Sequence, residues 1–199
     1  MIDYSKIRIP FLSKEIIKKH ADFFRRKFWN DSLPVDIEKI IDLKLKIDII
    51  PIPNLMKICN VDALISSDYE SIYVDHDDYL DDKYQNRLRF SLSHEIGHYI
   101  LHQDIYKSFK IKNFADFYRA ISTIPNEQYG YLETQANKFA NFLLVPRQKL
   151  ITERDRLILK YKEIQTIKDR NSLNSYLAIP LSNIFGVSSE VVEIALNEL

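Results

Sequence analysis

Glycine is scarce in this sequence of 199 residues. Average usage would supply roughly 14 glycines in a chain of this length, whereas this chain contains three, Gly97, Gly130 and Gly186. Because glycine loses more conformational freedom on folding than any other residue, we expect each one to stand where the backbone needs it. The expectation is therefore that the backbone is constrained at all three positions.

The sequence also contains only one cysteine and has no net charge. The single cysteine, Cys59, excludes an intramolecular disulfide framework and a cysteine-based zinc finger. Lys and Arg together number 28, as do Asp and Glu, so no net charge draws the chain toward nucleic acid or a membrane surface. The composition is 46% hydrophobic and 28% charged, which is typical of a globular protein with a core.

Long apolar runs are missing as well. The residues from Met1 to Lys6 contain no continuous apolar segment of the kind found in a secretory signal. The longest uncharged stretch, Asn171 to Ser189, includes Pro180 and several Asn and Ser residues, so we do not expect it to span a bilayer. These features predict a cytoplasmic protein with no membrane partner.

Hydrophobic periodicity predicts a chain of mixed helices and short strands. Helix signals cover residues 13–28, 36–43, 84–102, 131–144 and 148–168, and strand signals cover 46–52, 63–66 and 71–75. The acidic stretch from Asp75 to Asp82 lacks the Gly and Glu that a calcium loop needs, so we interpret it as a solvated loop. A linker with its own local helix is expected between Asp104 and Tyr129.

The candidate catalytic and metal-binding residues lie in residues 94–98, which read His-Glu-Ile-Gly-His. Residues four apart on a helix lie on one face, so His94 and His98 can share one metal ion. Glu95 is then positioned to take a proton from the attacking water. The two histidines could instead be ordinary core or surface residues, but Glu95 is the only formal charge between Phe90 and His102. Gly97 would leave room for another backbone to approach.

A catalytic zinc site needs a third protein ligand. His102 lies about 12 Å along the helix axis from His94, too far to share a tetrahedral ion, so we assign it a supporting role. Glu133 is the better candidate, because it lies in line with the apolar Ala136 and Ala140 and therefore points inward. An inward carboxylate is costly unless it is paired or bound to metal. The alternative is an N-terminal helix charge favoured by the helix dipole.

Two segments resemble the ImmA/IrrE family of metallo-endopeptidases. They are Arg87 to His102, which contains the HExxH motif, and Glu133 to Pro146. The similarity extends over roughly residues 35 to 199 and includes the closing segment Phe185-Gly-Val-Ser188. The linker between His98 and Glu133 does not match the family pattern.

The resemblance implies a zinc-dependent, gluzincin-like peptidase with His94, His98 and Glu133 as ligands and Glu95 as general base; Mn²⁺ is a possible replacement for Zn²⁺. It also implies a protein substrate, a helix-turn-helix repressor or antitoxin whose cleavage regulates transcription in a mobile element, a toxin–antitoxin system or a stress response. Because the chain ends at residue 199, without the sensor domain of the IrrE branch, we expect a mobile-element or toxin–antitoxin role rather than a DNA-damage role.

The resemblance leaves two parts of the site open. The second donor to the reaction's oxyanion could be Tyr129, Tyr131 or His102. For substrate binding, we predict that Ser71 to Asp75, with Ile72, Tyr73 and Val74 at its centre, is an edge strand that pairs with an extended peptide.

The C-terminal tail predicts a helix-turn-helix-like segment. From Leu177 to Leu199 the pattern indicates two short helices joined at Gly186, with Ser188 as the N-cap of the second. The second helix carries acidic residues and no Lys or Arg, so we expect packing or substrate docking rather than DNA binding.

These features together predict an α+β fold. Its zincin-like metallopeptidase domain, residues 1–168, would pack a small sheet on the HExxH helix and the Glu-bearing helix, and residues 169–199 would form the helical segment. An alternative function is a catalytically silent binding or sensor module that sequesters a regulatory partner. Such a module would have no need of Glu95, so the intact motif favours the enzyme.

Overall fold

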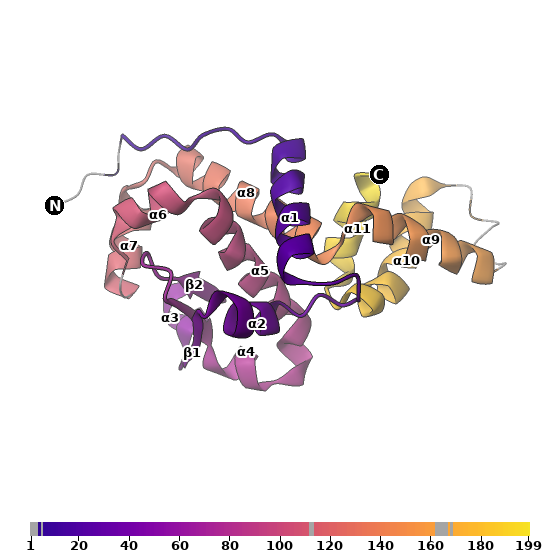
Figure 1. Cartoon of the computed structure of the whole chain (residues 1–199), viewed down its shortest axis with the longest axis horizontal. Helices are drawn as coiled ribbons and strands as arrows, with labels where there is room; N and C mark the ends of the chain where they lie inside the picture. The colour runs from indigo at the N-terminus through magenta and orange to yellow at the C-terminus, as the bar shows by residue number, and fades with distance from the viewer. Residues whose placement is uncertain (1–3, 5, 112–113, 162–166, 168) are drawn as a thin grey trace.

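The computed structural model describes residue 4 and residues 6–111, 114–161, 167 and 169–199. Their architecture is α+β, mostly helical with one small sheet (Figure 1). In chain order the elements are α1 (Lys14–Phe28), α2 (Ile37–Ile40), the π-helix η1 (Ile41–Leu45), β1 (Asp48–Ile52), α3 (Leu55–Cys59), β2 (Ala63–Ile65), β3 (Ser71–Asp75), α4 (His76–Leu80), the 3₁₀-helix η2 (Asp82–Tyr84), α5 (Gln85–Leu101), α6 (Gln103–Phe109), α7 (Phe114–Thr123), α8 (Asn126–Leu144), α9 (Arg147–Lys160), α10 (Arg170–Phe185) and α11 (Ser189–Asn197).

The sheet has the strand order β1-β3-β2, with β1 parallel and β2 antiparallel to β3. The prediction that Ile72, Tyr73 and Val74 form an edge strand is therefore wrong, because β3 is the middle strand and pairs on both sides. Its central position also explains why Ile72 and Val74 are fully buried. The edge strand that lies against α5 is β2.

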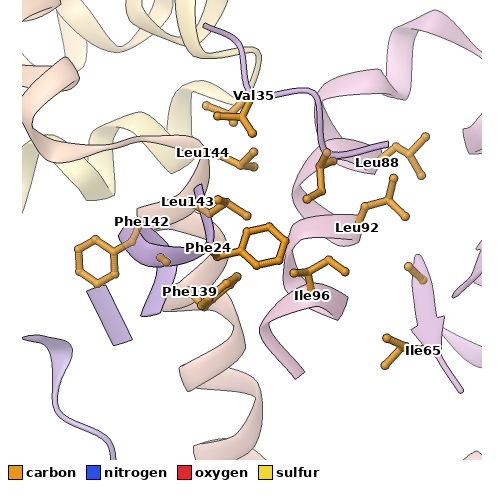
Figure 2. Close-up of a cluster of buried hydrophobic side chains, with 14 of the residues drawn as sticks. Phe24, Val35, Ile65, Leu88, Leu92, Ile96, Phe139, Phe142, Leu143 and Leu144 are labelled. Carbon is orange, nitrogen blue, oxygen red and sulfur yellow. The ribbon is translucent and has the colours of Figure 1, made fainter. Parts of the chain in front are cut away.

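Helices α1, α5 and α8 pack together and enclose the main core. The predicted start of α1 is confirmed, since the Ser13 side chain accepts the amide of Ile16 and caps the helix. Figure 2 shows the Phe24 side chain of α1 between α8 and α5, with Phe139 on one side and Ile96 on the other. This packing holds the two helices that carry the HExxH motif and Glu133 in fixed positions.

Two local predictions were wrong. The acidic stretch after β3 forms α4 rather than a loop, because the Asp75 carboxylate accepts the amides of Asp77 and Asp78 and caps a new helix. Helix α8 begins at Asn126, several residues before the expected start, so Gly130 lies inside a helix. A Cβ at Gly130 would meet no atom within 4 Å, and the backbone there is not constrained.

The C-terminal helices lie on the opposite side of the molecule from the sheet (Figure 1). The predicted bend at Gly186, which has a φ of +63°, and the Ser188 cap of α11 are both confirmed. Helix α10 is longer than expected and begins at Arg170, whereas α9 ends at Lys160 rather than continuing to Lys168. The expected domain boundary stays a prediction, and Lys168 lies outside the described residues.

The C-terminal segment is tied to α5 and α8 by hydrogen bonds. Arg89 of α5 donates to the Gly186 carbonyl, and the Asn141 amide of α8 donates to the Val191 carbonyl at 2.9 Å.

Taken singly, none of the helices in the described ranges is both long enough and apolar enough to cross a membrane. The pair α10 and α11 passes that test together by length and composition, but the two are bent by 117°.

Candidate metal centre

Helix α5 presents His94 and His98 one turn apart, and α8 crosses close behind them. The approach is close because residue 97 is glycine: a Cβ there would lie 3.0 Å from the Ala136 Cα of α8. The expectation that Gly97 makes room for another backbone is confirmed. Since Glu133 lies one turn before Ala136 on α8, this contact also brings the carboxylate to the histidines.

Three donor groups, two imidazoles and one carboxylate, converge at this point. The Nε2 atoms of His94 and His98 are 2.9 Å apart, and Glu133 places Oε2 3.2 Å from His94 Nε2 and Oε1 3.6 Å from His98 Nε2. Two ligand atoms bound about 2.1 Å from one tetrahedral ion are separated by roughly 3.4 Å. The two imidazoles and the carboxylate therefore fit the donor set and the spacing of a metal site with three protein ligands.

Glu95 lies beside this cluster and belongs to the group of His94, Glu95 and His98 whose ligand atoms all fall within 4.8 Å of one another. Its Oε2 accepts the backbone amide of Ile65 in β2 at 2.8 Å. Burial raises the pKa of Glu95 to about 7, while the charge of His94 and the Ile65 amide act in the opposite direction. A carboxylate that titrates near neutral pH is suited to general base catalysis.

His94 is held from both ends of its ring. Its Nδ1 lies 2.9 Å from Asn137 Oδ1, so Nδ1 donates and Nε2 faces Glu133. Burial acts to lower the pKa of His94, but the hydrogen bond to Glu133 and the charges of Glu95 and Glu133 outweigh it and raise the pKa to about 9. Metal binding through Nε2 must therefore displace a proton.

His98 is fully buried and is supported from behind by His102. The two Nδ1 atoms are 3.0 Å apart, and His102 Nε2 lies 3.1 Å from Gln135 Oε1. Burial lowers the pKa of His98 well below its usual value and that of His102 to about 4. The structure thus places His102 behind a candidate ligand, with its two ring nitrogens occupied by His98 and Gln135.

The three candidates for the oxyanion donor lie in different surroundings. Tyr129 lines the cleft in front of the cluster and hydrogen-bonds Glu133, and burial raises its pKa. Tyr131 is 45% exposed and donates to Glu127 at 2.9 Å, outside the cleft lining. His102 is behind His98. Of the three, only the Tyr129 side chain faces the cleft.

The cleft has a volume of about 280 Å³ and is walled by β2 on one side and by α5 and α8 on the other. Tyr106 and Asn137 are among the lining residues that sequence reasoning did not assign to the site. The Tyr106 ring of α6 lies 4.7 Å from the His98 ring, and no spacing rule could have placed it there. Asn137 did carry a signal, because it follows Glu133 by one helical turn and so shares its face.

A family of known proteins matches the part of the chain that carries this cluster. Residues 79–197 match the profile of the peptidase family described as the IrrE N-terminal-like domain (Peptidase_M78). The chain belongs to this family. The match begins in α4, ends in α11 and contains all the residues of the cluster, so the His94–Glu95–His98 group belongs to a metallopeptidase domain. No curated protein matches the sequence.

Proposed function

We propose that the chain is a gluzincin-like zinc endopeptidase in which His94, His98 and Glu133 bind the metal and Glu95 is the general base. The observation that carries this proposal is the convergence of the two imidazoles and the Glu133 carboxylate, whose facing atoms lie 2.9, 3.2 and 3.6 Å apart in pairs. The presence of Glu95 beside them favours an enzyme over a silent binding module. When bound, the zinc would polarise the scissile carbonyl and make its water easier to deprotonate.

The chain's own residues supply the proton transfers and the orientation. Glu95 accepts the proton of the attacking water and delivers it to the leaving amine. The Ile65 amide fixes one carboxylate oxygen and leaves the other to face the cleft. The Tyr129 hydroxyl is the oxyanion donor in this proposal, because it faces the cleft beside Glu133.

Strand β2 is the surface on which we place the substrate. Asp62 and Ser66 hydrogen-bond with the backbone of β3, so alternation turns the backbone groups of Ala63 and Ile65 away from the sheet. The Ile65 amide is occupied by Glu95. The amide and carbonyl of Ala63 are therefore the groups that would pair with an extended peptide next to the metal.

A second hollow of about 620 Å³ opens beside the cleft and shares part of its wall. The shared residues are Asp62, Phe90, Ser91 and Asn137. Helix α11 lines its far side with Val191 and Ile194, so the C-terminal segment would contact a peptide that leaves the metal site. This placement supports substrate docking as the role of the tail.

For the substrate class we propose a helix-turn-helix repressor or antitoxin, cut in the cytoplasm to control transcription in a mobile element, a toxin–antitoxin system or a stress response. Membership of the family supports a protein substrate. The balanced net charge and the acidic α11 support recognition of the regulatory protein rather than of its DNA.

Metal analysis and one matched substitution test the function. The purified protein should hold about one zinc per chain, and Glu95→Gln should keep the zinc while abolishing cleavage of the helix-turn-helix protein encoded beside this gene. A metal-replete preparation without bound metal would refute the metallopeptidase. If Glu95→Gln still cleaved the substrate at the original rate, Glu95 would not be the base.

A further inference from the structure

A chain of hydrogen bonds runs from Pro10, in the N-terminal segment, to Nδ1 of His98, on the side of the ring that faces away from the proposed metal. Gln135 Nε2 donates to the Pro10 carbonyl at 2.9 Å, Gln135 Oε1 lies 3.1 Å from His102 Nε2, and His102 Nδ1 lies 3.0 Å from His98 Nδ1. We propose that this chain makes Gln135 and His102 positioning residues, which fix the tautomer of His98 so that its Nε2 lone pair faces the metal.

The direction of every hydrogen bond follows from the Pro10 end. A backbone carbonyl can only accept, so the Gln135 amide nitrogen must face it and the amide oxygen must face His102. An amide oxygen can only accept, so His102 carries its hydrogen on Nε2. These two steps leave the Nδ1 of a neutral His102 as an acceptor.

The last step sets His98. Because His102 Nδ1 accepts, His98 must carry its hydrogen on Nδ1, and its Nε2 is left with a free lone pair. That Nε2 is the atom that lies 2.9 Å from His94 Nε2 and 3.6 Å from Glu133. The opposite tautomer would place a hydrogen where the metal must bind.

Because the three side chains are buried, water cannot replace the hydrogen bonds between them. Gln135 is 5% exposed, His102 2% and His98 1%. A reversed amide or ring would bring donor against donor or acceptor against acceptor, with no solvent to compensate. The N-terminal segment that supplies the carbonyl lies outside residues 79–197, so an element beyond the family match supports the metal centre.

The chain offers a matched control for the N-terminal contact. Gln128, two turns earlier on α8, also binds this segment, because its Oε1 accepts the Ile9 amide at 2.8 Å. Gln128→Leu therefore loosens the same segment without touching His102. Gln135→Leu removes one tether of that segment and also the acceptor of His102.

The first test measures zinc affinity by competition with a chelator. We expect Gln135→Leu to weaken zinc binding about 10- to 100-fold, the usual range for loss of a residue that orients a metal ligand, and Gln128→Leu to leave it within twofold. His102→Leu and His102→Asn have side chains of similar size, but only Asn can accept from His98 Nδ1. His102→Asn should therefore retain more affinity than His102→Leu. Equal losses at residue 102, or equal effects of the two Gln substitutions, would overturn the proposal.

The second test needs neither activity nor metal. Long-range ¹H–¹⁵N spectra of the histidine rings in chelator-treated wild-type protein should show hydrogen on Nδ1 of His98 and on Nε2 of His102. A His98 ring with its hydrogen on Nε2 would overturn the proposal even if every variant failed to fold. The proposal rests on His98 as a metal ligand, but this spectrum separates the two: a chain that binds no zinc and still shows these tautomers would refute the proposed function alone.

Discussion

Ala136 of α8 lies against Gly97 of α5 so closely that a Cβ at residue 97 would stand 3.0 Å from the Ala136 Cα and 3.1 Å from its carbonyl oxygen. Both of these atoms belong to the backbone, so no side-chain rotation can relieve the contact. The approach is also what holds Glu133 near His94 and His98. The distance across the proposed metal site is therefore set at a position that has no side chain.

Gly97→Ala should weaken zinc binding, because the added methyl group must push α8 and its Glu133 away from α5. The substitution gains about 1 kcal/mol of intrinsic helix stability, so affinity should fall by more than stability does. Zinc competition and chemical denaturation measure the two effects. Gly130→Ala is the matched control, because it adds the same methyl group to α8 in open space. It should raise the free energy of unfolding by about 0.5–1 kcal/mol and leave zinc affinity unchanged. If the two variants behaved alike, the role given to the contact would be wrong.

Chelator-treated protein should lose stability between pH 7 and pH 9. A group whose pKa is raised by folding stabilises the folded state fully below its unfolded value, and this contribution disappears as the pH rises through the folded value. Folding raises the pKa of Glu95 from 4.5 to about 7, so the contribution of Glu95 is lost by near-neutral pH. Folding raises the pKa of His94 from 6.5 to about 9, so the contribution of His94 continues to fall up to pH 9. Denaturation at a series of pH values measures the slope, and His94→Gln should remove most of it above pH 7. A stability that rose over this range would contradict the pKa assigned to His94.

Tyr129→Phe should lower kcat about 100-fold while zinc content stays the same, because one donor to the developing oxyanion is lost. Tyr131→Phe changes the same atoms two residues away on an exposed face and should leave kcat unaltered. Steady-state kinetics of both variants on one peptide substrate provide the comparison. Equal rates for Tyr129→Phe and the wild type would exclude the Tyr129 hydroxyl as the donor.

Ala63→Pro should reduce kcat/KM by about two- to tenfold, the value of one amide hydrogen bond of roughly 0.5–1.5 kcal/mol. The ring removes the amide that we assign to the substrate backbone, whereas the hydrogen bonds of β2 to β3 come from neighbouring residues. Zinc content and the thermal unfolding midpoint serve as controls. Unchanged kcat/KM with intact zinc would move the substrate to another surface.

The parts of the structure that depend on local pattern could be predicted from the sequence. The Ser13 cap and periodic Phe and Ile residues fix α1, and the alternating strand at Ser71 to Asp75 is found with the expected bounds. The HExxH spacing places His94 and His98 on one face, and the apolar line through Ala136 turns Glu133 inward. Each of these inferences needs only a helix or strand period and the chemistry of single side chains.

What the sequence could not supply was long-range arrangement. Strand order depends on which of three short segments lies in the middle, and nothing in Ile72, Tyr73 or Val74 distinguishes a central strand from an edge strand. The contact between Gln135 and Pro10 joins residues 125 positions apart, and Tyr106 reaches His98 from a separate helix. Gly130 shows the opposite limit, since scarcity of a residue type does not prove a constraint at every place where it occurs.

The amide of Ile65 has a consequence for how cleavage is controlled. It holds Glu95 from the same strand whose Ala63 would receive the substrate, two residues away. If a peptide pairs with Ala63 as proposed, a peptide out of register would shift this short strand and draw the Glu95 carboxylate away from the scissile bond. In the proposed mechanism, correct backbone alignment of the substrate would therefore be a condition for proton transfer, and we expect a protein that binds loosely or out of register to be released uncut.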